Sequence, residues 1–188
     1  TYRTDRAVEL VRSLLPPKDA ENRIAGVVSL ARFLEEIKLE EEAERFYRAA
    51  AESRPELQLE VAAFLARSGR LNEALDLCEA QVSNPTIVAV SRIGIMGLTA
   101  ARARINSEAP AVARVADWIA KGRRDMPDSK AMQLHYAYLN ELQENHPTAI
   151  EVYEQYLSRS DLTFRARAIA ANNVAMLLAV TGDCAEAR

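Results

Sequence analysis

The chain has 188 residues, of which 49% are apolar and 27% charged, with a formal net charge of −3. This composition is typical of a folded domain and excludes a disordered chain. Because the balance is slightly acidic and no apolar run approaches the roughly 18 residues of a membrane span, we expect neither nucleic acid nor membrane as a partner.

The apolar pattern predicts helices along the whole chain and therefore an all-α fold. Large apolar residues recur at spacings of three and four, and no stretch alternates as a strand would. The predicted helices span 5–15, 22–37, 40–53, 56–68, 71–82, 86–105, 108–124, 128–143, 146–158 and 162–180, and a last helix begins at about 183. Prolines mark several boundaries, and Asn84-Pro85 and His146-Pro147 each suggest a helix cap followed by proline.

Pairs of alanines twelve positions apart indicate internal repeats. The pairs are Ala31 and Ala43, Ala62 and Ala74, Ala137 and Ala149, and Ala175 and Ala187. Gly69 and Gly182 occupy the same position between the two alanines of their pairs, where a turn is expected. Lys38 occupies that position in a third pair. Two antiparallel helices approach most closely where neither carries a large side chain, so each pair is expected to mark a helix crossing.

These features resemble the tetratricopeptide repeat family, a stack of helix–turn–helix units of about 34 residues. The best unit, from about 24 to 57, carries the family's small, aromatic and proline positions at Leu30-Ala31, Leu34, Ala43, Tyr47, Ala50 and Pro55. The stretch NNVAMLLAVTGDCAEA near the end is similar, with residues 56–84 a fair match. The stretch around 86–126 matches least well, with Ala111 or Val115 in the second-helix position.

The resemblance implies a right-handed α-solenoid of about four full units. Within a single domain at 1–188, we expect a half unit at 1–19, units at about 20–55, 56–84, 85–126 and 127–160, and a partial unit at 161–188. Incomplete units at both ends predict a fragment of a longer repeat protein, with fraying at residues 184–188. Exposed repeat ends also make a homo-oligomer a possibility to test.

No motif indicates catalysis, a cofactor or a metal site. The sequence lacks GxGxxG, GxxxxGK[ST], HExxH and GxSxG, and its two histidines, His135 and His146, have no evident nucleophile beside them. Cys78 and Cys184 lie far apart, which predicts reduced thiols and a cytoplasmic location. The acidic run at 35–44 and the basic run at 121–125 are expected to complement helix ends, and Trp118 to pack between helices.

The resemblance further implies a concave groove, lined by the first helix of each unit, that takes peptides or helices of partner proteins. Helical spacing from the small residues predicts its lining as Val28, Arg32, Leu59, Ala63, Met96, Ala100, Leu134, His135, Tyr138, Asn172, Asn173 and Met176, some of which would instead pack against the next unit. The family's clamp for a C-terminal carboxylate uses Lys and Asn at positions that here hold Val28, Ser29, Leu59 and Glu60. We therefore expect an amphipathic helix or apolar peptide instead.

The sequence thus predicts a non-enzymatic scaffold that binds a protein or peptide partner. An alternative is that the chain forms the regulatory or targeting arm of a larger enzyme, such as a signalling kinase or transferase, whose catalytic domain lies outside it. A helical repeat that reads RNA is disfavoured by the acidic charge.

Overall fold

A computed structural model describes residues 22–82, 86–102 and 109–182, together with Arg6, Glu9, Leu10, Ser13 and Pro17. Within these residues the regular structure is entirely helical and includes no strand. Most of the helix predicted at 5–15 lies outside the described residues, as do the cap predicted at 84–85, the helix predicted from 183 and the fraying predicted at 184–188.

The helices, in chain order, are α2 (Arg23–Glu36), α3 (Glu40–Ser53), α4 (Gln58–Arg67), α5 (Leu71–Glu79), α6 (Ile87–Ala100), α7 (Ala109–Asp125), α8 (Lys130–Leu142), α9 (His146–Leu157) and α10 (Phe164–Thr181), with a 3-10 turn, η1 (Pro55–Leu57), before α4. The predicted boundaries agree to within about one turn, except that α6 ends at Ala100 instead of 105. His146 is the first residue of α9, which corrects its predicted role as the cap, because Asn145 precedes the helix.

The turns inside three helix pairs share one backbone geometry. Gly69 has a φ of 76°, and Lys38 and Glu144 adopt φ values of 64° and 59° at the equivalent positions. In each turn the following N–H donates to the carbonyl five residues back at 2.9 Å, as in Leu39 to Leu34, Arg70 to Leu65 and Asn145 to Asn140. This is a Schellman-type closure of the first helix, so the alignment of Lys38 with Gly69 in the sequence reflects a shared turn.

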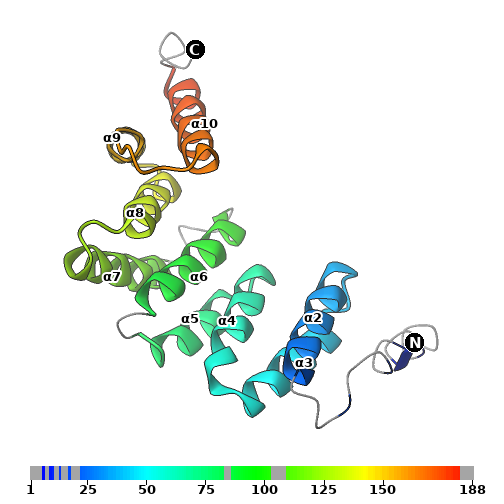
Figure 1. Ribbon diagram of the computed structural model, residues 1–188. Coiled ribbons are helices and arrows are strands. Elements are labelled where there is room, and N and C mark those ends of the chain that lie inside the picture. Colours follow the sequence, from blue (N-terminus) through cyan, green and yellow to red (C-terminus); the bar gives the residue numbers. More distant parts are fainter. Residues whose placement is uncertain are drawn as a thin grey trace.

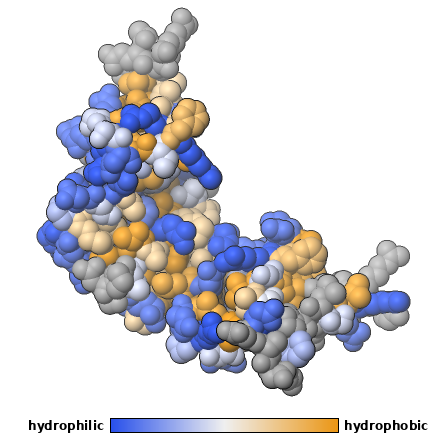
Figure 2. All heavy atoms as spheres, viewed as in Figure 1, coloured by the Kyte–Doolittle hydropathy of each residue, from blue (hydrophilic) through white to orange (hydrophobic). Residues whose placement is uncertain are grey.

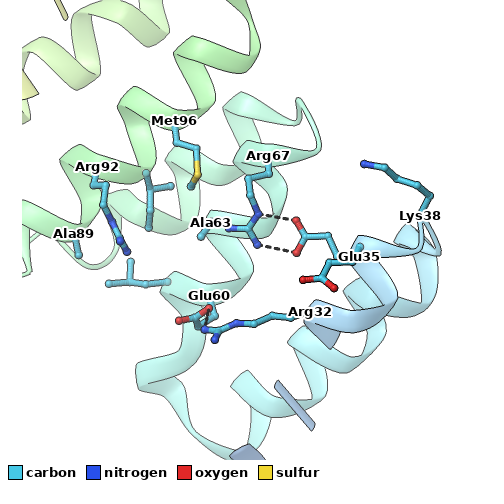
Figure 3. Close-up of a pocket in the computed structure, with 12 residues that line it drawn as sticks. Arg32, Glu35, Lys38, Glu60, Ala63, Arg67, Ala89, Arg92 and Met96 are labelled. Carbon is cyan, nitrogen blue, oxygen red and sulfur yellow. Dashed lines mark hydrogen bonds and ion pairs between the residues drawn. The ribbon is translucent and has the colours of Figure 1, made fainter. Parts of the chain in front are cut away.

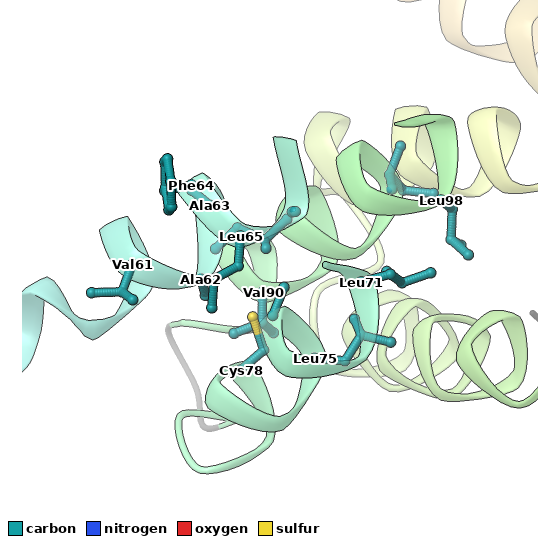
Figure 4. Packing of buried hydrophobic residues seen from close by; sticks show 14 of the residues in the cluster. Val61, Ala62, Ala63, Phe64, Leu65, Leu71, Leu75, Cys78, Val90 and Leu98 are labelled. Carbon is teal, nitrogen blue, oxygen red and sulfur yellow. The ribbon is translucent and has the colours of Figure 1, made fainter. Parts of the chain in front are cut away.

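The predicted alanine crossings are confirmed in three helix pairs. Six alanines, Ala31, Ala43, Ala62, Ala74, Ala137 and Ala149, have no exposed surface. Large buried side chains belong to the same cores, and Figure 4 shows this for α4 and α5, where Ala62 lies beside Leu65 and near Cys78 of α5. Ala175 is only half-buried, and its partner position 187 lies outside the described residues.

Helices α6 and α7 approach each other through a glycine. A Cβ atom added at Gly94 would lie 2.6 Å from Cγ2 of Val115, which has no exposed surface. Of the two predicted second-helix positions, Val115 is therefore the one that faces the small residue. About one turn further, a Cβ atom added at Gly97 would lie 2.7 Å from Leu71 and 3.4 Å from Ala66. The two glycines therefore let α6 approach α7 on one side and α4 and α5 on the other.

The helix pairs form a curved row. Each helix packs on its neighbours in the chain, and α6 also packs directly on both α4 and α8. Figure 1 shows α4, α6 and α10 along the inside of the curve and α5, α7 and α9 along the outside. The space-filling view shows the body hollowed on the inner side, with polar and apolar side chains both exposed there (Figure 2). None of the described helices is long and apolar enough to cross a membrane.

Candidate functional site

The inner side of the curve carries a groove of about 570 Å³ between α2, α4 and α6. Its lining consists of Arg32, Glu35, Glu36, Lys38, Leu59, Glu60, Ala63, Arg67, Ala89, Arg92, Ile93 and Met96. Figure 3 shows these side chains converging from three first helices of successive pairs. Four of the residues predicted to line a groove, Arg32, Leu59, Ala63 and Met96, are thus brought together.

The floor of the groove is apolar. Ala63 and Ile93 are buried, whereas Leu59 and Met96 are half-buried and rest on the hydrophobic core. All four come from α4 and α6, which pack directly on each other. Because Leu59 and Met96 keep part of their surface exposed, a ligand that covers them gains hydrophobic contact without moving the helices.

Ion pairs connect α2 to α4 across the groove. Arg32 contacts Glu60 at 3.1 Å, and Arg67 holds Glu35 through two hydrogen bonds of 2.6 and 2.8 Å (Figure 3). Helices α2 and α4 pack on each other far less than α4 and α6 do, so these long side chains bridge the space between them. The opening between α2 and α4 is what makes the groove.

Glu35 is held as a carboxylate by its neighbours. Burial acts to raise the pKa of Glu35, but the hydrogen bonds and charge of Arg67, with a hydrogen bond from the Tyr47 hydroxyl, bring the pKa below its ordinary value. Burial and the nearby Glu35 raise the pKa of Tyr47 to about 12, so its hydroxyl stays protonated and donates at 3.0 Å. The α2–α4 bridge therefore continues into the second helix α3.

We expect the Glu35→Gln variant to unfold with a free energy lower by about 1–2 kcal/mol at pH 7, because the charged hydrogen bonds to Arg67 are lost. The folded-state pKa of Glu35 lies below the ordinary 4.5, so the stability it contributes is present above pH 4.5 and is lost as the pH falls through the folded-state pKa. Urea unfolding should show that wild type and variant differ in free energy of unfolding at pH 7, and that this difference becomes smaller in acid. The neighbouring Glu36→Gln variant is the control. An equal loss of unfolding free energy in Glu35→Gln and Glu36→Gln would show that the Glu35–Arg67 contact does not stabilise the fold.

A similar polar cluster recurs at the other end of the row. Tyr153 on α9 donates to Glu141 on α8 at 3.1 Å, and Asn173 on α10 donates to the Tyr153 oxygen at 3.0 Å. Glu35 and Tyr47 each lie four residues after an alanine of the first pair. Glu141 and Tyr153 occupy the same positions after the alanines of the pair in α8 and α9. A first-helix residue of the next pair completes both clusters, so they are repeated connections between neighbouring pairs.

The remaining predicted groove residues lie elsewhere. Val28 packs against the core of the first pairs, whereas Leu134 packs on the core formed by α8, α9 and α10. Tyr138 meets the Tyr153 ring edge-on with centroids 5.9 Å apart. Asn172 and Met176 contact each other on the exposed side of α10, Ala100 is exposed at the end of α6, and Asn173 belongs to the cluster just described.

His135 is buried between helices, with 7% of its surface exposed. Its Nδ1 atom has no hydrogen-bond partner within the described part of the chain. Burial, and to a lesser extent the charge of Arg92, lower the pKa of His135 to about 4. The ring is therefore neutral at physiological pH and contributes packing at this position.

The prediction lacked six charged groove residues, namely Glu35, Glu36, Lys38, Glu60, Arg67 and Arg92. A sequence signal existed for two of them, since Arg67 follows Ala63 by one helical turn and Arg92 precedes Met96 by one turn. These positions share a helix face with predicted residues, but their charge suits an exposed surface equally well.

The charged runs and the buried thiol have structural roles. Glu40, Glu41 and Glu42 occupy the first turn of α3, as predicted, where acids complement the helix dipole. Arg123, in the last turn of α7, lies 3.8 Å over the Tyr136 ring. Trp118 and Cys78 are buried in the core, and burial raises the pKa of the Cys78 thiol to about 12, which makes it unreactive.

Within the described residues, no group of three or more His, Cys, Asp and Glu side chains is placed to hold a metal ion. Comparison of the chain with protein-family models and with curated protein sequences finds no match.

Proposed function

We propose that this chain is a scaffold that binds a peptide or helix of a partner protein in the groove between α2, α4 and α6. The observation that carries the proposal is the apolar floor of the groove, in which Leu59 and Met96 keep exposed surface over the buried Ala63 and Ile93, with charged walls around them. Such a combination suits burial of a partner's apolar side chain with polar contacts around it.

We further propose that the helix pairs form a right-handed α-solenoid of tetratricopeptide-like units. Three features support this arrangement: the buried alanine crossings, the shared left-handed turn after the first helix, and the packing of each helix on its neighbours. In such an array the groove is preformed, because every wall belongs to a helix already packed in the core. Binding then loses little conformational entropy on the scaffold side.

The charged groups of the groove favour binding over chemistry. Glu35 and Glu60 are each engaged by an arginine, and the Tyr47 hydroxyl has a raised pKa that keeps it protonated. Carboxylates held in this way position the helices and shape the walls. The proposed mechanism is surface burial without a covalent step.

A selection from a phage library of random dodecapeptides, with the full chain as bait, tests the proposal. Synthetic copies of the selected peptides should bind Met96→Glu at least tenfold more weakly than wild type in fluorescence anisotropy, because the change buries a charge on the apolar floor. Ala113→Glu, on the exposed side of α7, is the matched control.

Circular dichroism melting curves should show both variants folded. Equal affinity of wild type and Met96→Glu for every selected peptide would remove this groove as the binding site.

A further inference from the structure

We infer that the groove selects peptide segments in which an Asp or Glu side chain lies close to a large apolar one, with Arg92 binding the carboxylate. This inference rests on the proposed function and names the chemistry of the partner. The arginines of the groove differ in whether a carboxylate of the chain already binds them.

Two of the arginines that line the groove are already bound to carboxylates of the chain. Arg32 is engaged by Glu60 and Arg67 by Glu35. Arg92, in contrast, forms no ion pair or hydrogen bond with any residue in the described ranges. Four cationic and three acidic side chains line the groove, so it carries a net positive charge within a chain whose net charge is −3.

Arg92 is placed beside the apolar floor. It lies one helical turn before Met96 on the same side of α6, and Figure 3 shows its side chain extending into the groove. A peptide that covers Met96 and Leu59 therefore also removes water from the Arg92 guanidinium.

Removing water from an unpaired charge is unfavourable, and this gives the groove its selectivity. A neutral or basic segment over the floor would leave the guanidinium without its water and without a partner. A segment that places a carboxylate there restores the interaction in the bidentate geometry that arginine provides. Arg92 thus strengthens the binding of acidic segments and weakens the binding of basic ones.

The carboxylate is inferred to be a side chain and not a chain terminus. Arg92 offers two parallel donors, which an Asp or Glu side chain accepts from within a segment that runs over the floor of α4 and α6.

The test uses the same random dodecapeptide library with wild type, Arg92→Gln and Arg92→Glu, and with Arg124→Gln on the exposed side of α7 as the matched control. Wild type and Arg124→Gln should both enrich Asp or Glu within one helical turn of an aliphatic or aromatic residue. For a selected peptide, Arg92→Gln should weaken binding about tenfold, and changing the peptide's acid to the amide should add little further loss in that variant. Arg92→Glu should enrich Lys or Arg instead.

Three results would overturn the inference: no acidic enrichment with wild type, the same acid-to-amide ratio of affinities in wild type and Arg92→Gln, or binding that is lost on C-terminal amidation of the peptide but not on removal of its acid. The proposed function fails separately, when peptides bind Met96→Glu and wild type equally. A peptide that is sensitive to Met96→Glu but not to Arg92→Gln would reject only the role of Arg92.

Discussion

Replacing Phe64 by Ala is expected to lower the free energy of unfolding by about 3–5 kcal/mol. Phe64 on α4 is 1% exposed, and its ring lies 5.3 Å from that of Tyr47 on α3, with the planes at 35°. The side chain therefore joins the first helix pair to the second. Truncation removes the buried ring and leaves a cavity beside the Tyr47 ring.

Urea unfolding followed by circular dichroism measures this loss. Phe33→Ala on α2 is the control. Because Phe33 is 46% exposed, its truncation should lower the free energy of unfolding much less than Phe64→Ala does. A comparable loss in both variants would show that Phe64 does not hold the two pairs together. Since the pairs form a row, the variant is also expected to broaden the transition as the first pair separates from the rest.

The second large effect is expected where α6 crosses α7. Gly94→Ala places a methyl group 2.6 Å from Cγ2 and 3.1 Å from Cγ1 of Val115, both carried on a β-branched side chain that cannot rotate away. We expect a net loss of about 1–3 kcal/mol, even though alanine favours helix over glycine by nearly 1 kcal/mol.

A double-mutant cycle with Val115→Ala isolates the clash. In the Val115→Ala background the added methyl has room, so Gly94→Ala should become neutral or stabilising, with a coupling energy of about 1–3 kcal/mol. Urea unfolding of the four proteins gives the coupling. Additive effects would mean that α6 and α7 shift apart freely, and that glycine is not required for their approach.

The sequence predicts the local structure well, for reasons visible in single residues. The period of apolar residues locates each helix from α2 to α10, because a helix face is set within one stretch of chain. The alanine pairs at twelve-residue spacing mark three of the crossings. Lys38 and Glu144 both adopt the left-handed conformation at the turn position that Gly69 marks, seven residues after the first alanine of each pair.

The groove is predicted in part. Arg32, Leu59 and Met96 come together as helical spacing from the small residues suggested, but they lie with charged residues that spacing alone does not select. Glu35 and Arg67 form their contact across two helix pairs. Such a contact depends on how far one pair turns relative to the next, and local periodicity contains no information on that rotation.

By itself, then, the sequence determined the helices, their antiparallel pairing and the small residues at three crossings, since each depends on neighbours within a few turns. Only the tertiary structure decided that α2 stands apart from α4 and that α6 packs closely through Gly94 and Gly97. It also decided that Arg92 faces the apolar floor without a carboxylate among the described residues. The physical reason is that the spacing and rotation between pairs follow from the fit of side chains brought together from distant parts of the chain.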